Sequence, residues 1–121
     1  MAYTVKSIRP FIGSKNYQQS RDFYKALGFE ERSLDEHMCL FRVNESLGFY
    51  LQDAYVADWV DNSMIVLEVD SLEDCEKELR AKGLTERFPG VRFSGPKSFG
   101  WGRELYMHDP AGVLWHFCEF S

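Results

Sequence analysis

Residues 101–117 read WGRELYMHDPAGVLWHF, and this stretch determines how the C-terminal part of the chain folds. Apolar side chains alternate with polar ones around Leu105 and Met107, and the alternation returns over residues 113–117. A period of two is typical of strands that bury one face. Between the two runs, residues 109–112 place Asp, Pro and Gly where a type I turn favours them. The stretch therefore predicts two strands joined by a tight turn.

The composition predicts one globular domain. The 121 residues are enough for a core of ordinary size. A content of 45% hydrophobic and 27% charged residues is typical of folded proteins. Aromatic residues are unusually frequent at 16%. This excess is consistent with an aromatic-rich core and equally with a pocket for a flat or apolar ligand.

Charge and cysteine content narrow the function classes. The net charge of −5 argues against binding of nucleic acid through its phosphates and is compatible with a cationic ligand. The cysteines Cys39, Cys75 and Cys118 are far apart and odd in number, which favours reduced thiols over a disulfide or thiolate–metal framework. No apolar run reaches the roughly 18 residues of a membrane span. We therefore expect a cytoplasmic protein without a membrane partner.

Two helix signatures occur 55 positions apart (83 minus 28). Asn16 and Ser71 are suitable N-caps, and Gly28 and Gly83 are suitable C-terminal stops. Apolar stripes of helical period lie between each cap and its stop. Similar phrases follow the two helices, Gly-Phe-Glu-Glu-Arg and Gly-Leu-Thr-Glu-Arg. The chain therefore reads as a duplicated unit.

Strand-like runs flank both helices in the same order. In the first half they cover residues 5–12, then about 29–34, 38–43 and 47–52. In the second half they cover residues 63–69, then about 85–88, 103–108 and 113–120. Each half reads β-α-β-β-β, which predicts an α+β fold of two modules, about 5–61 and 62–121, within a single domain, 1–121. One module alone would leave one face of its sheet exposed to water. The two modules must therefore combine into a larger sheet with their helices outside.

Several motifs resemble one protein family. Trp-Gly-Arg-Glu at 101–104, the Asp-Pro-Ala-Gly turn, the closing His116-Phe117 and the Ser-Gly-Pro at 94–96 resemble the bleomycin resistance proteins. These belong to the vicinal oxygen chelate superfamily, with the glyoxalases and the extradiol dioxygenases. The resemblance implies paired βαβββ modules that form a curved mixed sheet, or cup. It also implies a homodimer with a ligand groove at its interface, domain swapping being one way to pair the modules.

The two halves differ between Phe88 and Gly102, where Gly and Pro are frequent. We expect a long loop here, and a loop of this length in a small domain is more often functional or mobile than idle. It contains neither a GxGxxG motif that opens a helix nor a Walker Lys-Ser/Thr, which argues against nucleotide binding.

Metal ligands in enzymes of this superfamily come from the first and last strand of each module. The resemblance places Arg9, Tyr50, Met64 and His116 at these four positions. Arg cannot lose its proton to bind a cation, and Met is a poor donor for a hard ion. The sequence therefore predicts no metal and no other cofactor.

Two polar residues of the expected cup have two interpretations each. His116 is either a hydrogen-bonded core residue or a ligand contact that can donate a proton. Glu68 shares a face with Met64, and a carboxylate there needs a partner, for which Arg9 is the candidate. That pair is either an internal salt bridge that closes the cavity or a grip on a charged ligand.

No catalytic constellation is found. Cys75 lies in an acidic helix, which raises the pKa of a thiol, and no GxSxG motif occurs. The resemblance instead implies that Trp101 stacks on a flat ligand, and an exposed Trp in a Gly-flanked loop favours the same role. Residues 30–36 carry Arg32 and no aromatic residue, unlike the corresponding acidic segment of the bleomycin resistance proteins. This departure argues against bleomycin itself as the ligand.

We therefore expect a cytoplasmic homodimer that binds a small organic molecule, aromatic or cationic, without a metal, as drug-sequestering antibiotic resistance proteins do. The expected ligand contacts are Trp101, Tyr50, Met64, His116, Arg9, Glu68, Phe41 and Phe11. One alternative is a metal-dependent lyase, dioxygenase or thiol transferase of the same superfamily. Another is a structural or regulatory module whose cup is filled by its own side chains.

Overall fold

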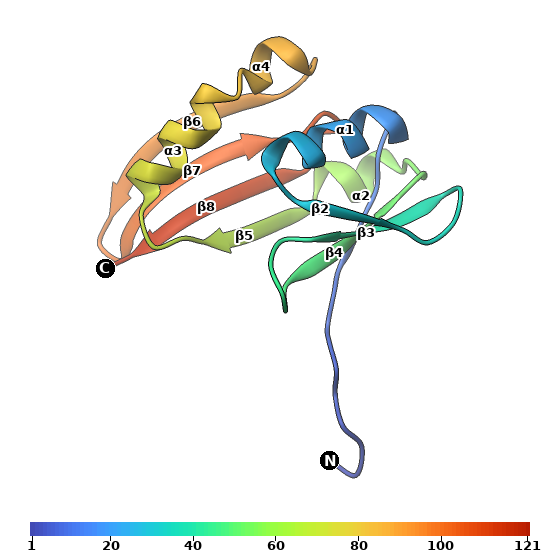
Figure 1. The fold of residues 1–121 in the computed structure, drawn as a ribbon. Coiled ribbons are helices and arrows are strands. Elements are labelled where there is room, and N and C mark those ends of the chain that lie inside the picture. Colours follow the sequence, from blue (N-terminus) through green and yellow to red (C-terminus); the bar gives the residue numbers. More distant parts are fainter.

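The computed structural model describes residues 1–121 and consists of two four-stranded sheets with helices on one side (Figure 1). The first half contains β1 (Phe11–Ile12), α1 (Tyr17–Leu27), β2 (Glu30–Ser33), β3 (Met38–Arg42), β4 (Gly48–Gln52) and α2 (Ala57–Asp61). The second half contains β5 (Met64–Glu68), α3 (Leu72–Ala81), α4 (Leu84–Arg87), β6 (Arg92–Phe99), β7 (Gly102–His108) and β8 (Leu114–Phe120).

The two sheets share one topology. Their strand orders are β1-β4-β3-β2 and β5-β8-β7-β6. In each sheet the first strand runs parallel to the last, and the other neighbours are antiparallel. The expected βαβββ repeat and the α+β class are confirmed, in the form of two separate mixed sheets.

The caps of the two long helices are confirmed. The backbone N–H of Gln19 donates to Asn16 Oδ1 at 3.0 Å, and that of Asp74 donates to Ser71 Oγ at 3.1 Å. Gly28 ends α1 in the left-handed conformation with φ 105°, which a residue without a Cβ adopts at little cost.

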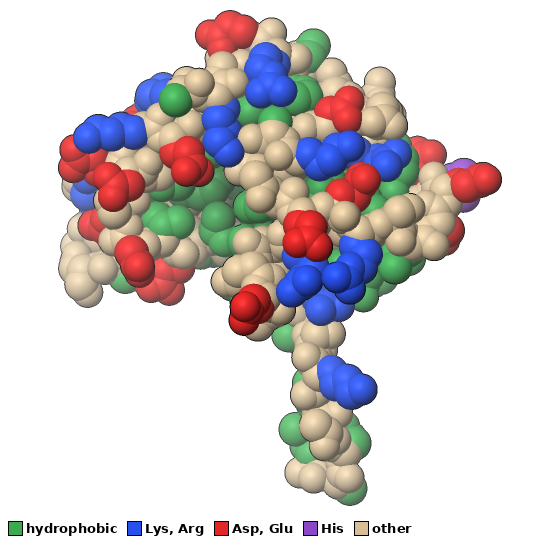
Figure 2. Space-filling model, viewed as in Figure 1, with side chains coloured by type: hydrophobic (Ala, Val, Ile, Leu, Met, Phe, Trp, Pro, Cys, Tyr) green, Lys and Arg blue, Asp and Glu red, His purple; other side chains and the backbone are tan.

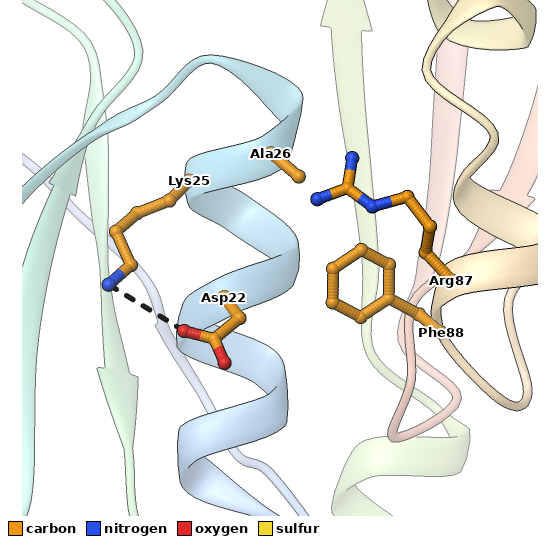
Figure 3. Close-up of a pocket in the computed structure, with 5 residues that line it drawn as sticks. All are labelled: Asp22, Lys25, Ala26, Arg87 and Phe88. Atoms are coloured by element: carbon orange, nitrogen blue, oxygen red, sulfur yellow. Dashed lines mark ion pairs between the residues drawn. The ribbon is translucent and has the colours of Figure 1, made fainter.

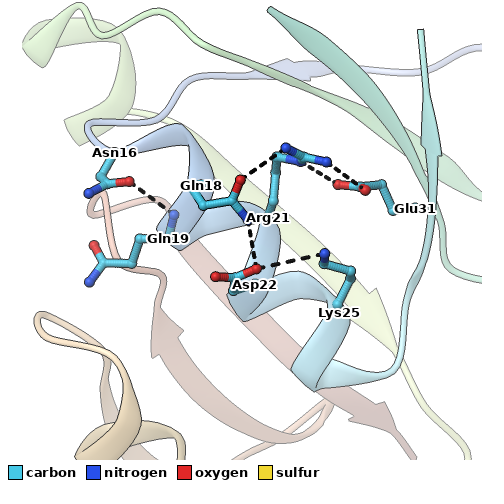
Figure 4. A network of polar contacts seen from close by, with 7 residues as sticks. All are labelled: Asn16, Gln18, Gln19, Arg21, Asp22, Lys25 and Glu31. Carbon is cyan, nitrogen blue, oxygen red and sulfur yellow. Dashed lines mark hydrogen bonds and ion pairs between the residues drawn. The ribbon is translucent and has the colours of Figure 1, made fainter. Parts of the chain in front are cut away.

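Polar side chains on the exposed face of α1 fasten this helix to the N-terminal sheet (Figure 4). Arg21 donates to both carboxylate oxygens of Glu31 on β2, at 2.6 and 2.9 Å. Gln18 accepts a further hydrogen bond from Arg21 at 3.1 Å. The contact with Arg21 lowers the pKa of Glu31, so this carboxylate is ionised and already has its partner.

The hairpin of β7 and β8 forms as expected, around a buried turn. Asp109 Oδ1 accepts the backbone N–H groups of residues 111–113 at 2.8 to 2.9 Å. Asp109 Oδ2 accepts the hydroxyl of Tyr24 at 2.5 Å, and Trp115 Nε1 donates to the same hydroxyl at 3.0 Å. The turn of the second module is thereby attached to α1 of the first.

The strand expected over residues 85–88 is wrong. These residues lie mainly in the short helix α4, Leu84–Arg87. Gly83 adopts the left-handed conformation with φ 62° and starts a new helical turn directly after α3. The side chain of Leu84 is buried, and it anchors this turn in the core.

The loop expected between Phe88 and Gly102 is also wrong, because it contains β6. This strand pairs with β7, and the register shifts between Ser94 and Lys97. The shift, together with the Gly and Pro residues, interrupts the alternation of side chains that identifies a strand in a sequence.

The strand expected over residues 5–12 is reduced to β1, whose two residues pair with Tyr50 and Leu51. Residues 1–10, which we call the N-terminal arm, form no strand and extend away from the body of the molecule (Figure 1). Pro10 directly precedes β1 and has no backbone N–H to donate to a neighbouring strand, which favours the end of the pairing at this point. The side chain of Ile8 in this arm is almost fully exposed.

One hydrophobic core of 20 buried residues draws on both modules. Tyr24 of α1 lies at its centre, with ring centroids 5.0 Å from Phe49 and 5.7 Å from Trp115. Because α1 and α3 cover the same side of the two sheets, the opposite side of each sheet is left uncovered (Figure 1). None of the helices combines the length and apolarity needed to span a membrane.

Candidate functional site

The C-terminal sheet has one face without a cover. Directly paired residues on neighbouring strands point to the same side of a sheet, so the registers of β5 to β8 sort their side chains into two sets. One set includes Leu105, Met107, Trp115 and Phe117 and is buried against the helices. The other set, which we call the open face, comprises Met64, Val66, Glu68, Arg92, Ser94, Lys97, Phe99, Glu104, Tyr106, His108, Leu114, His116, Cys118 and Phe120.

Large apolar side chains of the open face are exposed to an unusual degree. Met64 and Val66 on β5 are 65% and 60% exposed, and Phe120 at the end of β8 is 50% exposed. Single apolar residues on a surface are ordinary, whereas several on one sheet face mark a place where something binds. The open face is therefore a candidate contact surface for a ligand or a partner.

Three aromatic rings, which we call the aromatic platform, pack together at one end of the open face. Trp101, in the turn between β6 and β7, lies parallel to Phe99 with ring centroids 5.1 Å apart and 5.2 Å from the ring of Phe120. The sequence analysis named Trp101 as a ligand contact but did not name Phe99 or Phe120. Gly102 pairs with both Phe99 and Phe120, a register that becomes visible only once β6 is known to be a strand.

A polar cluster occupies the centre of the open face. Glu104 is buried, and its carboxylate accepts hydrogen bonds from His116 Nδ1 and, at 3.0 Å, from the hydroxyl of Tyr106. The thiol of Cys118 lies 3.6 Å from the same carboxylate. Burial alone raises the pKa of Glu104, but the hydrogen bonds from His116 and Tyr106 outweigh it and lower the pKa, so the carboxylate is ionised.

This cluster provides polar recognition and no activated nucleophile. The hydrogen bond to Glu104 occupies Nδ1 of His116, which leaves Nε2 for a ligand. Burial, followed by the charge of Glu104, raises the pKa of Cys118 to about 11, so its thiol is protonated at neutral pH. The hydrogen bond to Glu104 likewise raises the pKa of Tyr106. His116 therefore has the hydrogen-bond partner that the first of its two interpretations requires, and its role as a ligand contact stays a prediction.

The remaining expected contacts lie on the N-terminal sheet. The rings of Phe11 and Tyr50 stack at 4.9 Å, and Arg9 donates to the Tyr50 hydroxyl at 3.4 Å. Arg9 Nε is buried without a hydrogen-bond partner. No ion pair or hydrogen bond joins Arg9 to Glu68, since Arg9 precedes β1 of the N-terminal sheet and Glu68 lies on β5 of the C-terminal sheet. The expected salt bridge between them is therefore not formed inside the chain.

Phe41 does not belong to the candidate site, which corrects the expectation from the sequence. Its side chain has no exposed surface. The ring lies 5.5 Å from Tyr24 and 5.7 Å from Phe49 in the core. The alternation along β3 directs Phe41 towards α1 and its neighbour Leu40 towards the uncovered side.

The residues present do not fit a metal centre. Of the four positions at which the resemblance implies ligands, Tyr50 lies on the N-terminal sheet and Arg9 in the arm beside it, and Met64 and His116 lie on the C-terminal sheet. Only His116 is a ligand that divalent ions favour. No three His, Cys, Asp or Glu side chains lie together in an arrangement that could hold a metal ion.

The largest hollow on the surface, about 660 Å³, lies between α1 and α4 and is lined by Asp22, Lys25, Ala26, Arg87 and Phe88 (Figure 3). Lys25 pairs with Asp22 at 3.7 Å, and the guanidinium of Arg87 lies 5.2 Å from the ring of Phe88. The hollow is shallow, and its charged groups already have partners. It therefore offers a ligand less than the open face does.

Comparison with known proteins places the fold. No family model matches the chain, and no curated protein matches it. A bleomycin-binding protein solved in complex with bleomycin has a TM-score of 0.78 and 20% identity, covering 97% of this chain and 100% of that chain. An antibiotic-binding protein from Streptomyces sp. CB03234 has a TM-score of 0.75 and 19% identity, covering 100% of this chain and 99% of that chain.

A glyoxalase/bleomycin resistance protein/dioxygenase from Nocardioides has a TM-score of 0.73 and 20% identity, covering 98% of this chain and 86% of that chain. The chain therefore shares the fold of these bleomycin-binding and glyoxalase/bleomycin resistance/dioxygenase proteins, as the resemblance of its C-terminal hairpin implies. At these identities the likeness concerns the fold.

Proposed function

We propose that the protein is a metal-free homodimer that sequesters a small organic molecule, aromatic and cationic, on the open face of the C-terminal sheet. The observation that carries the proposal is that one uncovered face combines the aromatic platform with the ionised Glu104. A flat ring stacked on Trp101 gains both burial and a favourable ring geometry. The carboxylate of Glu104 attracts a positive charge, and Nε2 of His116 supplies a hydrogen bond.

The ligands of the structural neighbours support this class of function. One neighbour holds bleomycin, and another is an antibiotic-binding protein. A role in antibiotic resistance follows if this chain retains a toxic compound in the same way. The free cysteines Cys39, Cys75 and Cys118 are consistent with the reducing cytoplasm as its location.

A second copy of the chain covers the open face. The N-terminal sheet supplies the complementary surface, since Phe11 is 54% exposed and stacks on Tyr50. Arg9 lacks a carboxylate partner in its own chain, and Glu68 on the open face is exposed and in no ion pair. When the N-terminal sheet of one subunit lies on the open face of the other, Arg9 meets Glu68 of the partner subunit, and the N-terminal arm is free to exchange between subunits.

Tryptophan quenching tests the ligand site. Compounds that carry a flat heteroaromatic ring and a cationic group should quench fluorescence with a dissociation constant in the micromolar range or below. Trp101→Ala should abolish that signal and weaken binding, measured by calorimetry, at least tenfold, because a stacked aromatic anchor contributes about 1.4 kcal/mol or more. Lys77→Ala is the control, since Lys77 is an exposed residue of α3 on the helix side of the molecule. Equal affinity of both variants would contradict the proposal.

Metal analysis separates this function from that of a metal-dependent lyase, dioxygenase or thiol transferase. The isolated protein should contain no stoichiometric divalent ion, and chelators should leave ligand binding unchanged. A zinc, nickel, iron or manganese ion bound at one per chain, and lost in His116→Ala, would replace the proposal with the enzymatic alternative.

A further inference from the structure

A second hollow lies on the helix side of the molecule, where the two modules meet. We call it the junction cavity, and its volume is about 260 Å³. Figure 2 shows hydrophobic side chains at the floor of this hollow and acidic side chains on the α3 side of its rim. Its apolar walls are formed by Leu27 and Phe29 from the first module and by Leu67, Val69, Leu79 and Phe117 from the second.

The rim of the junction cavity carries a carboxylate without a partner. Three of the four acidic residues of α3 pair with basic side chains: Glu73 with Lys77, Glu76 with Arg80 and Glu78 with Lys82. The fourth, Asp74, has no basic residue within salt-bridge distance. It lines the cavity together with Glu78, whose carboxylate lies 3.9 Å from Lys82 Nζ. The helix therefore presents one unpaired negative charge at the edge of an apolar pocket.

The thiol of Cys75 also lines the cavity, and its pKa reflects the charges nearby. Burial and then the charges of Glu78 and Glu76 raise its pKa, which indicates a negative potential at the rim. Cys39 and Cys118 are 1% and 2% exposed, whereas Cys75 is partly exposed. In the native protein it is therefore the thiol that a reagent reaches first.

We propose that the junction cavity binds a small organic cation, a primary amine carried on a compact apolar group such as a phenylalkyl chain. The apolar group fills the pocket, and the ammonium group pairs with Asp74 at the rim. Pockets for drug-sized ligands enclose roughly 300 to 1,000 Å³, so a cavity of about 260 Å³ accepts a molecule below that size.

This site is independent of the open face. Leu67 and Phe117 point into the junction cavity, and the alternation along β5 and β8 directs their neighbours Glu68 and His116 to the opposite side of the sheet. The two sites can therefore bind ligands independently, and each proposal can be tested without the other.

Protection of Cys75 from modification tests the proposal. The protein is treated with methyl methanethiosulfonate, an uncharged thiol reagent, and labelling is followed by intact-protein mass spectrometry. 2-Phenylethylamine should slow the labelling saturably. 2-Phenylethanol, which has nearly the same shape without the charge, should need about a three- to fivefold higher concentration, as expected for one exposed ion pair. The labelling rate of glutathione in the same solutions controls for direct effects on the reagent.

Two matched variants assign the charge preference. In Asp74→Asn, 2-phenylethylamine should protect Cys75 no better than 2-phenylethanol does. Glu73 lies on the same helix but does not line the cavity, so Glu73→Gln should leave the preference for the amine intact. Trp101→Ala should leave the protection unchanged even where it abolishes quenching at the open face. Equal protection by amine and alcohol in the unmodified sequence, or no protection by either up to their solubility limits, would overturn the proposal.

Discussion

The two sheets share one topology but present different uncovered faces. In the C-terminal sheet, β5 pairs with β8 along five residues, and the open face carries the aromatic platform and the ionised Glu104. In the N-terminal sheet, β1 pairs with β4 along two residues, and the corresponding face carries Arg9 with a buried, unpartnered nitrogen beside a stacked Phe11 and Tyr50.

This difference shows where a duplicated fold is free to vary. The helix side of each sheet must fill one shared core, so its residues are constrained by packing. The opposite faces carry no such constraint. One has acquired groups suited to a ligand, and the other has a complementary aromatic and cationic surface. The four predictions below test this division, from the largest expected effect to the smallest.

The turns that close the two sheets should differ most in their contribution to stability. Asp109 accepts three backbone N–H groups in the buried β7–β8 turn, and Asn44 accepts two in the exposed β3–β4 turn. Asp109→Ala leaves buried donors unsatisfied and should lower the free energy of unfolding by about 3 kcal/mol or more. Asn44→Ala should cost about 1 kcal/mol or less, because water replaces its bonds. Urea denaturation measures both, and similar losses would show that the turns are equivalent.

Charge reversal should test whether the two uncovered faces meet between subunits. Arg9→Glu and Glu68→Arg should each weaken the dimer about tenfold or more, because each places like charges against one another. Mixing the two variants should yield a heterodimer in which both contacts are again oppositely charged, and association should recover. Analytical ultracentrifugation of the single variants and their mixture measures this. Unchanged association of both single variants would contradict the proposed contact.

The two helix caps should contribute equally to the free energy of unfolding, since the two modules cap their long helices in the same way. Asn16→Ala and Ser71→Ala each remove one side-chain hydrogen bond to the first turn of a helix. Each should lower the free energy of unfolding by about 1 kcal/mol. Thermal denaturation followed by circular dichroism provides the measurement. A loss confined to one variant would show that the modules differ on the helix side as well.

Low pH should reduce the stabilising contribution of one carboxylate in each sheet, Glu31 and Glu104. Only Glu104 should also contribute to ligand binding. The pKa of Glu104 and that of Glu31 are lowered in the folded protein from a usual value of 4.5. Each carboxylate therefore stabilises the fold above about pH 4.5 and loses that contribution as the pH falls through its folded pKa. Glu104→Gln and Glu31→Gln should each flatten the decline of stability below this pH.

Ligand binding distinguishes these two variants. Glu104→Gln should weaken the binding of a cationic ligand at neutral pH, and Glu31→Gln should not, because Glu31 is held by Arg21 on the helix side. Titrations at neutral pH measure the affinity. An equal loss of affinity in both variants would show that the effect comes from the net charge of the protein and not from the open face.

Local sequence features predicted much of the fold because they act over short distances. The caps at Asn16 and Ser71 and the turn at Asp109 need only neighbouring residues, and all three are found as predicted. Strand β6 was missed because Gly95, Pro96 and a register shift break its alternation. The helix α4 was missed because a single left-handed Gly83 restarts a helical turn that a propensity argument reads as a stop.

The sequence by itself determined the duplication, the helix caps and the hairpin, since each rests on a repeated phrase or on a period or spacing of a few residues. Trp101 was singled out by the family resemblance and its Gly-flanked position, and its role stays a proposal. Only the tertiary structure decided which residues gather at a site. It placed Phe41 in the core, separated Arg9 from Glu68, and joined Phe99 and Phe120 to Trp101. The physical reason is that strand order and register depend on contacts between residues far apart in the chain, and a shift of one position sends a side chain to the opposite face of a sheet.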